Sequence, residues 1–287
     1  MKPASGCAVC NPRSPAQPET APLFRRTFLA SLAAPCTLPA SGAWTAPPVI
    51  ERAWFGPADR AHGHDALGIG RYPGRVHAIV RDSGRQHEVH LDLAVDAAFE
   101  DGLIRLADLD ADGSPQIVLV AASRSAGAAI TVLGVERREG APVLLERARG
   151  PSVGPGRWLN PVGVGDFHGG GRQDVVAVAT PHIGGVLTLY RYQRPHLVPV
   201  AHERDVSNHV YGELEQQLAA VTIRDGRRCV AIPNQRRHRL RFLAPTLRGG
   251  WVAVAPDAVF DHPIESVRSV AGNRVQVQAG THIRLLR

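Results

Sequence analysis

Short runs of apolar residues, many of them alternating with polar ones, recur along the chain from residue 49 onward. Most runs are four to eight residues long and are bounded by Gly, Pro, Asp or Asn, a pattern typical of β-strands. The predicted strands are residues 76–80, 88–93, 104–108, 117–122, 129–135, 143–146, 162–166, 175–179, 186–192, 197–201, 218–223, 228–232, 239–243, 251–254, 267–270, 275–278 and 282–286. No long stretch has the 3.6-residue period of a helix, so the chain is predicted to be an all-β sandwich, barrel or propeller.

An internal repeat favours the propeller among these three. Residues 106–118 align with residues 164–176, so that Asp108 matches Asp166 and Gly113 matches Gly171. A fainter third copy covers residues 218–232, and a shorter remainder follows residue 266. Repetition at a fixed spacing is the mark of stacked structural units. We expect five units, over residues 49–100, 101–150, 151–205, 206–255 and 256–287, with residues 49–54 as a strand that closes a ring.

The repeated unit, a strand followed by a D-x-D-x-D-G-like loop and a second strand, resembles the FG-GAP or VCBS repeat. The resemblance covers about residues 66–287 and is most specific at residues 107–118. It implies a β-propeller of four-stranded blades, here five, that forms a single domain over residues 44–287.

The first copy of the loop carries the strongest chemical signal. Asp108, Asp110 and Asp112 alternate with apolar residues, and Gly113 permits the bend that lets three carboxylates converge. Calcium prefers several hard oxygen ligands in a flexible geometry. The family resemblance implies one calcium site with five ligands, namely the side chains of Asp108, Asp110, Asp112 and Gln116 and the carbonyl of Ser114.

Two features weaken this calcium prediction. Gln116 replaces the acid that the family has at that position, so a weak structural site is expected. The alternative is an Asx-type turn, in which the carboxylates accept backbone N–H groups. In the second copy His168 and Gly170 occupy ligand positions, and no metal is expected there.

Other candidate binding residues lie between predicted strands. The loops of a propeller gather at its two ends, where ligands bind. Five polar or aromatic residues in such positions are candidates for a ligand-binding face: Trp158, Asn160, His182, Asn208 and His209. The alternative for each of them is ordinary loop packing and turn capping.

The N-terminus resembles a twin-arginine export signal. Arg25 and Arg26 precede a short apolar run, and small residues at Ser41 and Ala43 suit cleavage after residue 43. Residues 1–43 are therefore predicted to be a signal peptide, and the mature protein is predicted to be periplasmic or secreted. No stretch approaches the roughly 20 apolar residues of a membrane-spanning helix, so no membrane span is predicted.

Composition adds little to this picture. The net charge is +7, a modest value for 287 residues, so no nucleic-acid partner is predicted. Three of the four cysteines precede residue 44, which leaves Cys229 alone in the mature chain without a disulfide partner. The sequence contains no G-x-S-x-G, Walker, H-E-x-x-H or Rossmann motif.

The leading functional hypothesis is an exported, non-enzymatic β-propeller that binds a protein, a glycan or a small molecule. Two alternatives stay open at this point. One is a periplasmic hydrolase or lyase with its site at one mouth of the propeller. The other is a structural subunit of an envelope assembly, which a large exposed apolar patch would indicate.

Overall fold

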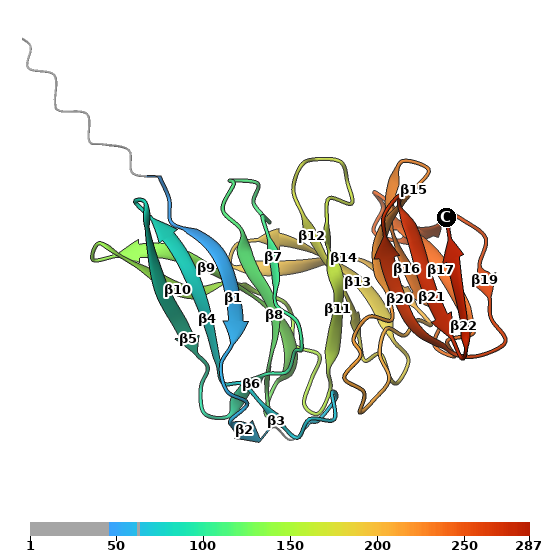
Figure 1. The fold of residues 1–287 in the computed structure, drawn as a ribbon, viewed down its shortest axis with the longest axis horizontal. Coiled ribbons are helices and arrows are strands. Elements are labelled where there is room, and N and C mark those ends of the chain that lie inside the picture. Colours follow the sequence, from blue (N-terminus) through green and yellow to red (C-terminus); the bar gives the residue numbers. More distant parts are fainter. Residues whose placement is uncertain (1–45, 62–63) are drawn as a thin grey trace, which may run out of the picture. The chain divides into compact units, whose positions relative to one another are not determined.

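The computed structural model describes residues 46–61 and 64–287, which contain β-strands and no helix (Figure 1). The chain divides into Met1–Trp44 and Thr45–Arg287, and all that follows concerns the second part. The predicted signal peptide lies outside the described residues. No helix in the described part is long and apolar enough to cross a membrane.

The strands fall into successive antiparallel groups, called units one to five here in chain order, and units two and three are joined in one nine-stranded sheet by a parallel pairing of Arg149 with His196. Unit one contains β1 (Val49–Phe55), β4 (Arg75–Asp82) and β5 (Arg85–Asp92), beside a small ribbon of β2 (Arg60–Ala61) and β3 (Arg71–Tyr72). Unit two contains β7 (Arg105–Ala107), β8 (Gln116–Ser123), β9 (Gly127–Arg138) and β10 (Ala141–Arg149), and β6 (Ala97–Phe99) also pairs with β8. Unit three contains β11 (Leu159–Gly165), β12 (Asp174–Ala179), β13 (Val186–Gln193) and β14 (His196–Arg204).

Units four and five complete the described part. Unit four contains β15 (Ala220–Arg224), β16 (Arg227–Pro233), β17 (Arg239–Pro245), β18 (Trp251–Ala253) and β19 (Ala258–Val259). Unit five contains β20 (Ile264–Val270), β21 (Arg274–Ala279) and β22 (His282–Leu286). Every predicted strand overlaps an observed one, and the all-β prediction is confirmed.

Each unit packs face to face on the next one in chain order. Along β8, Ile117 and Leu119 join a core shared with unit one, whereas Val118 and Val120 join a core shared with unit three. Successive side chains of a strand point to opposite faces, so a strand covered on both faces must be apolar throughout. Two further core clusters lie between units three and four and between units four and five.

The two terminal units bury only one face each. In unit one, Val76 and Val80 face the core, while Arg75, His77 and Arg81 face away from it. β1 pairs with β4, so the prediction that residues 49–54 close the last unit is wrong. β1 lies beside β4 because this position buries the Ile50 side chain in the core between units one and two. No core cluster of described residues joins unit five to unit one.

Candidate functional site

Because the strands are antiparallel, successive loops lie at opposite ends of the units. One end, here called the Asp end, contains the loops at residues 108–115 and 166–173 and the turns at residues 194–195, 225–226 and 246–250. The other, here called the His end, contains the segments at residues 64–72, 180–185, 205–219 and 234–238. The predicted metal ligands lie at the Asp end, and the predicted ligand-binding residues lie at the His end.

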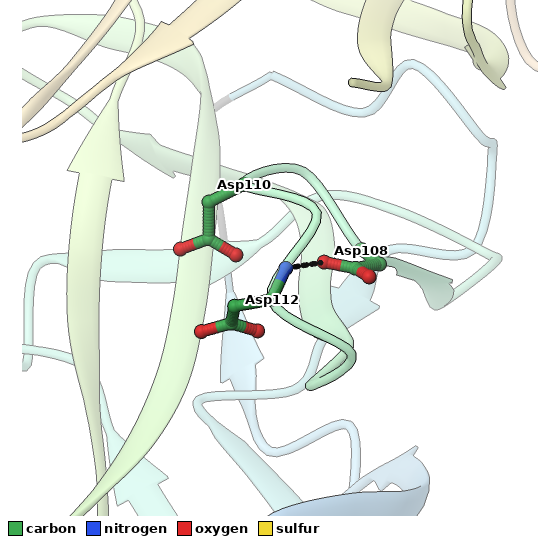
Figure 2. A group of neighbouring side chains, drawn as sticks. All are labelled: Asp108, Asp110 and Asp112. Atoms are coloured by element: carbon green, nitrogen blue, oxygen red, sulfur yellow. Dashed lines mark hydrogen bonds between the residues drawn. The ribbon is translucent and has the colours of Figure 1, made fainter. Parts of the chain in front are cut away.

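The first loop brings its three aspartates together (Figure 2). The carboxylate of Asp108 accepts the N–H groups of Asp112 at 3.1 Å and Gly113 at 2.9 Å, which bends the chain back on itself. Ala111 and Gly113 have φ values of 59° and 85°, the left-handed conformation that this bend needs. One oxygen from each of Asp108, Asp110 and Asp112 lies within 4.8 Å of the others. The cluster can therefore hold a metal ion, with no preference for one metal shown.

Gln116 and Arg194 place nitrogen donors at this cluster. The Gln116 Oε1 accepts the Leu109 N–H at 2.8 Å, and its Nε2 donates to Asp110 Oδ1 at 2.9 Å and to the Ser114 carbonyl at 2.7 Å. The opposite amide orientation would set two donors against each other at Leu109. Arg194, in the turn after β13, pairs with Asp110 at 3.1 Å. In this conformation Gln116 offers the cluster an N–H group, and it becomes a metal ligand only if its amide turns.

The second loop keeps the turn and fills the ligand positions with other groups. The Asp166 carboxylate accepts the N–H groups of residues 168–171 at 2.7 to 3.2 Å. These bonds, foremost that from Gly171, hold the pKa of Asp166 below its usual range. The Asp174 carboxylate lies 2.9 Å from His168 Nδ1 and 3.5 Å from Arg191 Nε. Among the described residues, the only group of acids and histidines that can hold a metal is the one in the first loop.

At the His end, the five predicted ligand-binding residues lie in one packed group. The Trp158 ring stacks on His182, with centroids 5.9 Å apart, and meets His209 edge-on at 4.8 Å. The Trp158 Nε1–H donates to the Glu100 carbonyl at 2.8 Å. Trp158 and His209 are both 1% exposed, so this aromatic group fills the junction between units two, three and four.

Asn160 and Asn208 tie units three and four together beside this group. Each side-chain amide donates to the other residue's backbone carbonyl, at 3.1 Å from Asn160 and 2.9 Å from Asn208. Both residues are 0% exposed. A ligand in solution does not reach them in this conformation, and their bonds are those of a structural junction. The packing alternative therefore describes these two residues well.

The two histidines of the group are neutral at pH 7. Burial lowers the pKa of both His182 and His209 to about 4, and for His182 the neighbouring His209 adds to the effect. The His209 Nε2 donates to the Glu213 carbonyl at 2.7 Å, because a carbonyl can only accept. Its Nδ1 therefore accepts the Nε2–H of His182 at 2.8 Å.

Sequence reasoning missed four exposed side chains in the loop segments around this group. Tyr211 is 57% exposed, and its ring meets His182 edge-on at 5.2 Å. Ile69, Ile183 and Leu214 are also exposed and belong to the same segments. We call Ile69, Ile183, Tyr211 and Leu214 the loop patch. Its signal in the sequence is a set of apolar residues inside Gly-containing loops, but exposure itself cannot be read from the sequence.

Comparison with known proteins assigns no function to these sites. No family model matches the chain, and no curated protein matches it in sequence. The FG-GAP/VCBS resemblance and the export signal therefore stay predictions. The evidence for a function lies in the side chains of the Asp end and the His end.

Proposed function

We propose that this protein is an exported, non-enzymatic binding protein whose five units are FG-GAP/VCBS-like blades of a propeller-type array, and that it binds a partner protein through the loop patch. The observation that carries the proposal is the contrast within the His end. Asn160, Asn208 and His209 are buried and His182 is half-buried, and these side chains bond within the group, whereas the neighbouring loop-patch side chains are exposed and apolar.

Several features of the loop patch suit a protein partner. The segments that carry it are fixed against each other, because the Gly212 N–H donates to the Ala66 carbonyl at 2.9 Å and Tyr211 packs on His182. Exposed Tyr, Leu and Ile side chains beside charged groups such as Glu213 resemble the apolar centre and polar rim of protein interfaces. A preformed surface also binds at a smaller entropic cost.

Site-specific photo-crosslinking in cells tests this surface. A photoreactive amino acid in place of Leu214 should give a discrete protein adduct, which the additional change Tyr211→Ser should weaken. Leu247, which is 92% exposed and lies at the Asp end, is the matched control position and should not give that adduct. The absence of an adduct at residue 214, or the same adducts from both positions, would contradict the proposal.

The proposal includes a weak structural calcium ion in the first loop. The clustered oxygens of Asp108, Asp110 and Asp112 support it, since carboxylates this close repel one another and a cation between them relieves the repulsion. The Gln116 amide and Arg194 oppose it, because they already donate to Asp110. Calcium would displace Arg194 from Asp110, and weak binding follows.

Thermal unfolding with EDTA and then with excess calcium tests this site. We expect a small calcium-dependent rise in the midpoint that Asp110→Ala abolishes. Gln116→Glu keeps the acceptor for Leu109 and adds an oxygen ligand, so the midpoint should rise further at the same calcium concentration. Calcium at 100-fold the dissociation constant of that variant would add about 2.7 kcal/mol to its free energy of unfolding. Arg85→Gln, in the turn between β4 and β5, is the control for altered charge. No calcium effect in either wild type or Gln116→Glu would show that the loop is only a turn.

A further inference from the structure

A cleft of about 300 Å³ opens at the Asp end between units three and four. Its apolar lining comes from Phe167, Ile223 and Pro245, and its basic side chains are those of Arg227, Arg228 and His168. We call these six residues the arginine cleft. It lies away from the loop patch, and its volume is near the lower limit of the clefts that hold small ligands.

Arg228 is held in place at one wall of the cleft. Its Nε donates to the Asp166 carbonyl at 3.1 Å. Its stem lies against Gly165, where a Cβ atom would come within 2.6 Å of the Arg228 Cδ. A glycine is therefore required for this arginine to lie across the end of β11. The guanidinium loses little further freedom when it binds a ligand, because its position is already fixed.

Arg227 precedes Arg228 at the start of β16 and also lines the cleft. One of its terminal nitrogens is 3.5 Å from the Pro245 carbonyl, at the end of β17. Neither Arg227 nor Arg228 forms an ion pair with a carboxylate among the described residues. Other arginines among the described residues do have such partners, for example Arg105 with Asp101 and Arg191 with Asp174.

The acids near the cleft are already occupied. Asp166 lines the cleft, but both of its oxygens accept backbone N–H groups of its own loop. Asp174 is engaged by His168 and Arg191. Arg227 and Arg228 therefore keep N–H donors that no carboxylate of the described residues accepts, and their two positive charges exceed the single negative charge of Asp166 in the cleft.

We propose that the arginine cleft binds an oxyanion group, a carboxylate, phosphate or sulfate, on a ligand whose body packs against Phe167 and Ile223. Guanidinium groups match the planar and tetrahedral oxygens of such anions with paired N–H donors. The apolar wall suits a ligand about the size of a monosaccharide or an amino acid. This site shares no residue with the loop patch, so a negative result for one proposal does not contradict the other.

Calorimetric titration of the full chain tests the cleft. The probes are inorganic phosphate, inorganic sulfate, galacturonate and galactose. At least one of the three anions should bind saturably, and galacturonate should bind at least about tenfold more tightly than its neutral counterpart galactose if a carboxylate is the natural group. Tighter binding of phosphate or of sulfate would assign the group to that anion instead.

Matched variants distinguish binding by the cleft arginines from a nonspecific effect of the protein's net charge. Arg227→Gln and Arg228→Gln should each weaken the tightest anion by about tenfold or more, with Arg228→Lys intermediate because it keeps the charge and loses the paired donors. Arg85→Gln changes the net charge equally, far along the chain in unit one, and should leave the affinity unchanged. Unfolding midpoints within the scatter of wild type show that each variant folds. The proposal is overturned if no anion binds saturably below about 50 mM, or if Arg85→Gln weakens binding as much as the cleft variants do.

Discussion

Replacement of Arg105 with leucine is expected to destabilise the fold by about 3 to 5 kcal/mol, because it leaves a buried charge without its partner. The Asp101 side chain is 0% exposed, and its carboxylate lies 2.9 Å from the Arg105 guanidinium. The same carboxylate accepts the N–H groups of Leu103 and Val120 at 3.0 Å each. Burial already raises the pKa of Asp101, and Arg105 counteracts that rise.

Urea unfolding at pH 7 measures this loss, with Arg75→Leu as the matched control. Arg75 pairs with Asp92 at 2.6 Å, but both side chains are more than 40% exposed. An exposed pair contributes at most about 1 kcal/mol, so the control should change little. The double variant Asp101→Asn/Arg105→Leu should recover part of the loss, because no buried charge is left. Equal losses in Arg105→Leu and Arg75→Leu would contradict this account of the buried ion pair.

Stability is also expected to fall as the pH is lowered from about 6.5 to 4, by at most about 3 kcal/mol for each of His182 and His209. The pKa of each is about 4 in the folded chain and 6.5 in an unfolded one. Between these values the unfolded chain binds a proton that the folded chain does not bind. Acid therefore favours unfolding, and above pH 6.5 the two histidines contribute no pH dependence.

The measurement is the free energy of unfolding at a series of pH values. Carboxylates add their own dependence at low pH, so the comparison is between slopes. His182→Gln/His209→Gln should show a shallower fall below pH 6.5 than wild type, whatever its absolute stability. His196→Gln, in an exposed position at the start of β14, should keep the wild-type slope. A double variant with an unchanged slope would show that the buried pair does not control the acid sensitivity.

The candidate sites divide according to the range of the interactions that build them. The bend of the first loop was predictable, because Asp108 bonds to N–H groups only four and five residues away. The role of Gln116 was not predictable, since the orientation of its side-chain amide depends on the hydrogen bond from the Leu109 N–H to Oε1. Arg194 reaches Asp110 across 84 residues of sequence, and no local pattern foretells that ion pair.

The predicted ligand-binding residues show the same division. Loop position alone identified Trp158, Asn160, His182, Asn208 and His209 as a group at one end of the fold, and they do lie together. Their burial was not predictable, because it depends on segments of units one and four that close over them. The exposed side chains at this end are instead those of the loop patch, which the sequence did not single out.

Strand positions and the turn chemistry of the first loop could be read from the sequence, because alternation and turn residues act over a few positions. The tertiary structure was needed to show which strand β1 pairs with, which residues of the His end are buried and which arginines lack a carboxylate partner. These outcomes depend on which faces meet across dozens of residues, as when Ile117 and Val118 of one strand enter two different cores. The side-chain period of a strand records that two faces exist, but not what covers each of them.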